Sequence, residues 1–197
     1  KMDIKDKNFG ITIAGVNSLF PAGDARREAY FYHLDDPEWQ EAGLAYLYKW
    51  RYARYGASVA GEVWLKGMDV NRVIFRLADM YLLRAECRVK MNDRAGAEAD
   101  LKVIRQRANA EMWPAENDSG DLQYDIFKER EKELLYEGHR YYDVVRNGYW
   151  KTELQGGFND LSVEDVKDGA LYLPVPQTAF SQNDLMIQNT FWASKMK

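Results

Sequence analysis

The chain has 197 residues, of which 46% are hydrophobic and 29% are charged, which fits one globular domain or a compact pair of subdomains. Its 27 Lys and Arg against 31 Asp and Glu give a net charge of −4, so it has little attraction for phosphate backbones. This balance argues against nucleic acid as a partner. No apolar run approaches the roughly 20 residues of a membrane span.

Residues 1–70 are predicted to form an irregular, aromatic-rich segment. Glycine and proline interrupt its short β-branched runs, and residues 38–67 are rich in Trp and Tyr. Aromatic side chains offer flat apolar faces with a polar edge, which suits sugars, peptides or another protein. The alternative is that these rings pack long helices.

Residues 71–147 are predicted to form a helical scaffold. A first helix is expected from a cap at Asp69 or Asn71 to about Lys90. Its buried face follows from residues that recur every three or four positions: Ile74, Leu77, Tyr81 and Ala85. A second helix over residues 95–108 has the same spacing, and the short join between the two predicts an antiparallel hairpin the size of one tetratricopeptide unit.

A third helix is expected from Asp121 to Glu137-Gly138, and a short fourth over residues 141–147. Residues 148–197 are expected to be loop-rich and to dock on the helices, because Pro174 and Pro176 force an extended path. The predicted fold is therefore mainly α, with tetratricopeptide-like helical hairpins, long irregular loops and little β.

Three acids of the third helix, Glu129, Glu133 and Glu137, recur every four residues on one face. Two carboxyl groups about 5–9.5 Å apart can hydrolyse a glycoside, so a carbohydrate-active enzyme is one hypothesis. Neighbouring Lys and Arg supply counter-charges at helical spacing, which favours a structural brace between consecutive helices instead. The brace residues are Arg130, Glu133, Glu137, Arg140 and Asp143.

Other chemistries have weaker support in the sequence. His33 and His139 lie far apart and no Cys-x-x-Cys pair exists, so no metal site is expected. Gly156-Gly157 lacks the Lys-Ser/Thr of a phosphate loop, and no cofactor is expected. The single cysteine, Cys87, is expected to be a small buried residue.

Three segments together resemble the SusD/RagB family of outer-membrane nutrient-binding lipoproteins of Bacteroidota. Residues 73–86, VIFRLADMYLLRAE, are similar to that family's "RlaEmyLlrAE" helix. Residues 129–146 are similar to its "ER..EL..EGhR..Dl.R" signature, and residues 173–189 to its "lPiPq.E...N..l.QN" ending. Asp24-Ala25-Arg26 and Lys49-Trp50-Arg51 stand where the family has "DpR" and "KyR". The departures from these motifs are Asp79, Ala25 and Ala179.

The resemblance implies a binding protein without catalytic residues, located at the outer membrane on the cell surface. It implies glycan capture together with a SusC-like TonB-dependent transporter, and attachment to the membrane only through an N-terminal lipid anchor absent from this chain. The chain resembles about the C-terminal third of a member and begins at Lys1 rather than at Met, so it is expected to be a fragment or processed piece.

Within that resemblance, residues 1–70 are expected to belong to the variable, ligand-facing region. Trp39, Trp50 and Trp64 are its candidate ligand contacts, and the alternative is that they fill the seam between subdomains. Peptide capture, or a tetratricopeptide-like scaffold that binds a protein partner, are the alternative functions.

Overall fold

The computed structural model describes residues 11–50, 53–57, 63–68, 73–181, 183 and 185–195, with backbone alone for 38, 39, 42, 53–57 and 63–68. The chain divides into two compact units, Lys1–Gly138 and His139–Lys197. This division falls within the predicted scaffold of residues 71–147, so the predicted first segment and most of that scaffold share one unit. The docking of residues 148–197 on the helices stays a prediction.

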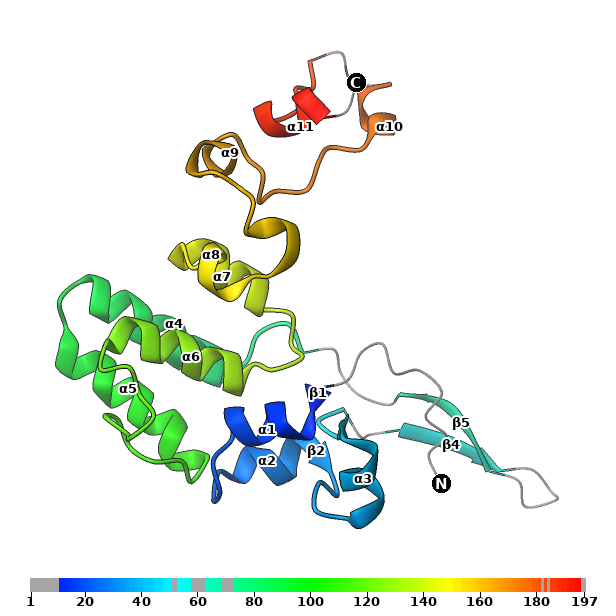
Figure 1. Ribbon diagram of the computed structural model, residues 1–197, viewed down its shortest axis with the longest axis vertical. Coiled ribbons are helices and arrows are strands. Elements are labelled where there is room, and N and C mark those ends of the chain that lie inside the picture. Colours follow the sequence, from blue (N-terminus) through cyan, green and yellow to red (C-terminus); the bar gives the residue numbers. More distant parts are fainter. Residues whose placement is uncertain are drawn as a thin grey trace. The chain divides into compact units, whose positions relative to one another are not determined.

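Short elements begin the first unit (Figure 1). Strands β1 (Ile11–Thr12) and β2 (Phe31–Tyr32) flank β3 (Leu44–Leu47) in an antiparallel sheet, with Ile11 opposite Ala45 and Phe31 opposite Leu47. Helices α1 (Ile13–Leu19), α2 (Ala25–Tyr30) and α3 (Pro37–Ala42) connect these strands. Strands β4 (Ala53–Ala57) and β5 (Val63–Met68) form a separate antiparallel pair.

This part of the chain therefore has more regular structure than the irregular segment predicted from its sequence. Its helices have six or seven residues and the strands of its three-stranded sheet two to four, which is too short for a helical or alternating period to be read. A small core holds them together and includes Val16, Phe20, Phe31 and Leu34, each at most 1% exposed.

Three longer helices form the rest of the first unit: α4 (Leu77–Lys90), α5 (Arg94–Arg107) and α6 (Leu122–Glu133). A short turn joins α4 to α5 as the predicted hairpin, and α6 packs against both (Figure 1). The predicted face of α5 is buried, with Ala97, Leu101, Ile104 and Ala108 at most 3% exposed. The mainly α fold is confirmed.

The start of α4 was predicted wrongly. The helix begins at Leu77, and Arg76 before it is extended, with φ −145° and ψ 163°. Ile74 and Leu77 are 64% and 72% exposed, while Ala78, Leu82 and Ala85 form the buried face. The predicted caps at Asp69 and Asn71 lie outside the described residues.

The N-terminus of α6 was predicted correctly and rests on Asp121. Its carboxylate Oδ1 accepts hydrogen bonds from the backbone N–H groups of Gln123 at 3.0 Å and Tyr124 at 3.4 Å. We expect Asp121→Ala to lower the free energy of unfolding by about 1 kcal/mol, because these N–H groups lose their acceptor. Urea denaturation measures this cost, and Asp121→Asn, which keeps an acceptor, should stay within about 0.5 kcal/mol of the unchanged chain. Equal losses in the two variants would contradict the capping role.

The second unit contains shorter helices: α7 (Arg140–Asn147), α8 (Trp150–Glu153), the 3-10 turn η1 (Gly156–Phe158), α9 (Val163–Lys167), α10 (Gln177–Phe180) and α11 (Thr190–Lys195). Gly148 ends α7 with φ 75°, a left-handed conformation that glycine adopts without strain. The side chain of Gln188 pairs with both the N–H and the C=O of Val175, at 3.1 and 3.0 Å, and so fixes the extended proline segment. Cys87, in α4, is exposed rather than buried.

Candidate functional site

The acid face predicted on the third helix exists, and it is buried. Glu129 and Glu133 lie on α6, and the side chain of Glu137 follows in the turn after it; their side chains are 1%, 0% and 1% exposed. The helix ends at Glu133 rather than at Glu137-Gly138, and Tyr136 and Gly138 take left-handed φ values of 62° and 84° in that turn.

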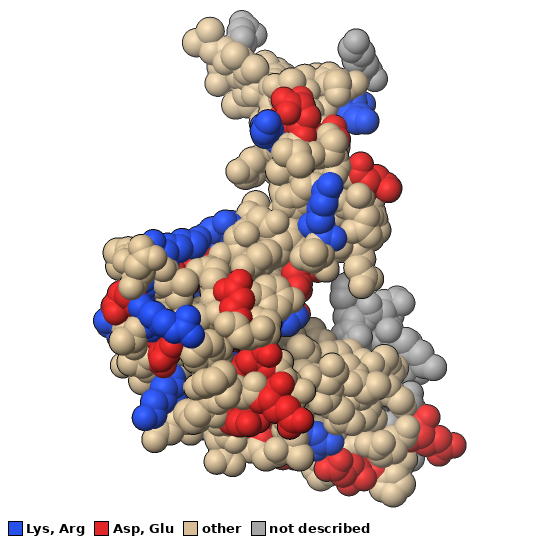
Figure 2. Space-filling view, turned by 60° about the vertical axis from the view of Figure 1, so that its left-hand side comes forward, with Lys and Arg blue, Asp and Glu red and all other residues tan. Residues whose placement is uncertain are grey.

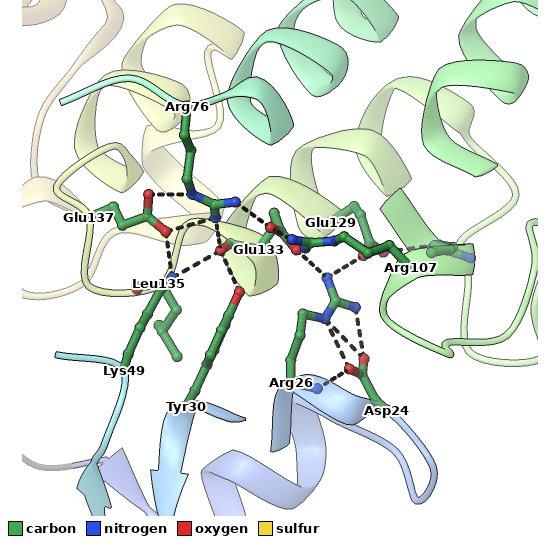
Figure 3. A network of polar contacts seen from close by, with 11 residues as sticks. Asp24, Arg26, Tyr30, Lys49, Arg76, Arg107, Glu129, Glu133, Leu135 and Glu137 are labelled. Carbon is green, nitrogen blue, oxygen red and sulfur yellow. Dashed lines mark hydrogen bonds and ion pairs between the residues drawn. The ribbon is translucent and has the colours of Figure 1, made fainter. Parts of the chain in front are cut away.

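Glu133 lies at the centre of a network that five segments of the first unit build (Figure 3). Its Oε1 accepts hydrogen bonds from Arg76 Nη1 at 2.6 Å and from Arg107 Nη2 at 2.5 Å. Its Oε2 lies 3.3 Å from Nη1 of Arg26, which comes from α2. Three guanidinium groups from three other segments therefore surround one fully buried carboxylate.

Glu129 extends the network along α6. Its two oxygens accept from Arg26 Nη1 at 2.6 Å and from Arg105 Nε at 2.9 Å. Arg26 in turn holds Asp24 through two parallel hydrogen bonds of 2.9 and 2.7 Å, and Arg105 holds Asp118 through two of 2.7 Å. Such forked pairs fix geometry as well as charge, because both guanidinium and carboxylate are planar.

Glu137 closes the other end of the network. Arg76 donates from Nε to its Oε2 and from Nη2 to its Oε1, both at 2.7 Å, and Lys49 Nζ donates to Oε1 at 2.5 Å. Lys49 also donates to the backbone carbonyls of Glu133 and Leu135, at 3.1 and 3.0 Å. Figure 3 shows Lys49 and Tyr30 reaching from the blue and cyan segments to the turn after α6. The carbonyls left free at this helix end are thus paired with side chains.

The pKa values of two acids follow from this arrangement. Burial acts to raise the pKa of Glu137, but hydrogen bonds from Arg76 and Lys49 outweigh it and hold the pKa below its ordinary value. Burial also acts to raise the pKa of Asp118, but hydrogen bonds from Arg105 and the Ala115 N–H outweigh it and lower the pKa. Burial lowers the pKa of Lys49, and the positive charge of Arg76 acts in the same direction, although Glu137 acts to raise it.

A pH dependence of stability is therefore expected. Acids with lowered pKa values in the fold stabilise it above their unfolded pKa values of about 4, and lose this contribution as the pH falls through the folded values. Urea midpoints should stay level from about pH 7 to about pH 5 and drop below about pH 4. Glu137→Gln should flatten part of that drop, whereas Glu164→Gln, at an exposed acid, should leave it unchanged. A Glu137→Gln profile parallel to that of the unchanged chain would contradict this role.

This network is a structural joint, by which we mean a set of contacts that holds separate segments of the chain together, rather than a catalytic site. Each of the three glutamates is buried and contacts at least two cationic side chains, so none faces solvent where it could protonate a leaving group or attack a sugar. The network instead links α2 and the turn after β3 to α4, α5 and α6. The charged residues of this network thus serve the assembly of the first unit.

The other predicted brace residues pair elsewhere. Arg130 on α6 is 2% exposed, and its Nη2 lies 2.7 Å from Oδ1 of Asp79 on α4. In the second unit Arg140 donates to Glu153, and Arg146 Nη2 lies 2.7 Å from Oδ1 of Asp143. Glu133 and Glu137 thus share one network, Arg130 pairs with Asp79, Arg140 with Glu153, and Asp143 with Arg146. A single brace made of these five residues stays a prediction.

Sequence reasoning did not assign the cations that complete the network. Arg26 and Lys49 belong to the short motifs Asp24-Ala25-Arg26 and Lys49-Trp50-Arg51, which were quoted for resemblance alone. Arg76 was expected inside a helix. These three cations share one feature that could have identified them: each is a basic residue within a quoted family motif, and each lies far along the chain from the acidic face of the third helix.

The tryptophans proposed as ligand contacts are only partly described. Trp50 follows β3 and is half-buried. Trp39 lies in α3 and Trp64 in β5, and their side chains lie outside the described part of the chain. In that described part, no group of three or more His, Cys, Asp or Glu side chains is placed to hold a metal ion.

Comparisons with known proteins agree with this scaffold. The model of the SusD family matches residues 34–192. SusD-like protein P25 of Formosa agariphila is 31% identical over 128 residues, which are 60% of this chain and 24% of that protein. SusD-like protein P38 of the same organism is 31% identical over 109 residues, or 50% and 21%. The chain belongs to the SusD family.

Solved structures agree in fold. A SusD homologue from Bacteroides thetaiotaomicron has a TM-score of 0.67 and 28% identity, covering 92% of this chain and 38% of that one. A SusD superfamily protein from Bacteroides vulgatus has a TM-score of 0.59 and 28% identity, covering 90% and 38%. The chain therefore spans well under half the length of these relatives.

Proposed function

We propose that this chain works in a cell-surface protein that binds a glycan or oligosaccharide for uptake and does not cleave it. The observation that carries the proposal is membership of the SusD family over residues 34–192. The buried ion network supports it, because the acids that suggested catalysis are held by arginine and lysine.

The partner in this proposal is a SusC-like TonB-dependent transporter, and the location is the outer membrane, through a lipid anchor. No helix among the described residues is long and apolar enough to cross a bilayer. The exposed charges of the face shown in Figure 2 are of both signs, and acidic and basic side chains are interspersed on it. A surface of this kind does not favour nucleic acid.

Purification from outer membranes of cells that make the full protein with an affinity tag tests this proposal. We expect a SusC-like β-barrel to co-purify, and the purified protein to retain a polysaccharide in affinity electrophoresis without shortening it. Recovery of a soluble protein partner alone would favour the scaffold alternative, and retention of peptides but not glycans would favour peptide capture.

A further inference from the structure

A hollow of about 330 Å³ lies beside the three-stranded sheet of the first unit. Its walls include Tyr32 at the end of β2 and Tyr48 just after β3, whose ring centroids are 5.4 Å apart. The ring of His33 stacks on Tyr32 with centroids 4.0 Å apart. Tyr48 keeps 38% of its surface exposed. Three rings are thus gathered at one solvent-facing hollow.

Carboxylates share this hollow with the rings. Glu28, Asp35 and Asp36 contribute to its walls, and their side chains are 65%, 75% and 55% exposed. A second hollow, of about 550 Å³, has Glu28 and Asp35 in its walls as well, so the two adjoin. Arg27 lines this second hollow and pairs with both acids, at 2.7 and 2.8 Å.

The combination of rings and acids selects a class of ligand. Aromatic faces attract the apolar C–H faces of a sugar ring, and carboxylates accept strong hydrogen bonds from its hydroxyl groups. Asp24, a fourth acid in the walls, is buried and paired with Arg26. The three exposed acids stand against one arginine, Arg27, so the groove keeps an excess of negative charge. An acidic sugar would meet like charges there, and this repulsion discriminates against it.

We propose that the groove formed by these two hollows is a subsite for a neutral oligosaccharide, with Tyr32 and Tyr48 as its stacking surface. This inference rests on the proposed function. It adds the position of a binding site in the fold and the charge of the sugar that the site accepts. The groove was not among the sites expected from the sequence, which favoured Trp39, Trp50 and Trp64.

Saturation-transfer difference NMR on the whole chain tests the subsite. The neutral probes are maltohexaose, cellohexaose and mannohexaose, and the acidic probe is hexagalacturonate. We expect transfer to at least one neutral probe and none to hexagalacturonate. Tyr48→Ala should reduce the neutral signal at least fivefold. Tyr142→Ala, at a tyrosine that is 70% exposed in the second unit, is the matched control and should leave it unchanged.

A second variant keeps the test valid even if Tyr48→Ala does not fold. Asp35→Asn combined with Asp36→Asn changes exposed charges, which contribute little to stability, and should allow hexagalacturonate to bind. A neutral signal that survives Tyr48→Ala would overturn the subsite while leaving glycan binding elsewhere intact. Transfer to hexagalacturonate equal to that of the neutral probes, or no transfer to any neutral probe, would also overturn it. The proposed function is tested separately: it fails if the full protein retains no glycan in affinity electrophoresis, or shortens the glycan that it retains.

Discussion

Replacing Glu133 by Gln is expected to lower the free energy of unfolding by about 3 kcal/mol, because three guanidinium groups then lose the negative charge they share. The side chain of Glu133 is fully buried, so water cannot take the place of the lost charge without opening the joint. Glutamine keeps the shape of the side chain, which separates the loss of charge from a packing defect. Urea denaturation followed by circular dichroism measures the change.

Glu98→Gln is the matched control. Glu98 lies on α5 in a surface pair with Arg94 and its side chain is 40% exposed, so its loss should cost less than about 0.5 kcal/mol. If Glu133→Gln were no more costly than Glu98→Gln, the network would contribute nothing to stability and the assignment of a structural joint would be wrong.

The second large effect concerns the pair that joins α4 to α6. Arg130 and Asp79 are both at most 2% exposed, and Arg130 also donates to the Asp79 carbonyl at 3.2 Å. Arg130→Met alone, or Asp79→Leu alone, should each cost about 3–5 kcal/mol, since each breaks a buried ion pair by removing one of its two charges.

The double variant, Asp79→Leu with Arg130→Met, is expected to recover most of that loss. Apolar residues that replace both members of a buried ion pair are often tolerated, because the desolvation cost disappears with the charges. A double-mutant cycle measured by urea denaturation should therefore give a large coupling energy. Additive losses would show that the two side chains stabilise the helices independently of each other.

The long helices could be predicted because their own residues carry the signal. On α5, Ala97, Leu101 and Ile104 recur at helical spacing, and all three are buried in the core shared with α4 and α6. The start of α4 could not be predicted from the same pattern. Ile74 continues the spacing, yet Arg76 is extended, with its guanidinium bound to Glu133 and Glu137. A contact 57 residues away thus outweighs local helical preference.

The same distance in sequence explains what was missed at the joint. The spacing of Glu129, Glu133 and Glu137 showed one acidic face, but their cations come from α2, the turn after β3, the residue before α4 and the end of α5. Arg26 and Glu133 are 107 residues apart. The periodicity of a sequence indicates which residues share one face of a single helix or strand. It does not indicate which distant residues contact that face.

The groove beside β2 and β3 escaped prediction for a related reason. Tyr32 and Tyr48 are brought together by the pairing of two short strands, in which Tyr32 lies opposite Tyr46. Neither strand is long enough for its alternating pattern to be recognised. The sequence prediction therefore favoured the tryptophans at neighbouring positions as ligand contacts. The ion network and the proposed stacking surface thus use different residues of the same unit.

The acids of α6 hold the fold together, and in the proposed function sugars bind elsewhere. A comparison of the unchanged protein with Glu133→Gln, both still folded, tests this division. It measures affinity toward the neutral hexasaccharides, the formation of shortened products and the urea midpoint. We expect equal affinity, no products from either protein and a lower midpoint for the variant. Hydrolysis by the unchanged protein that disappears in Glu133→Gln at an unchanged midpoint would contradict the claim.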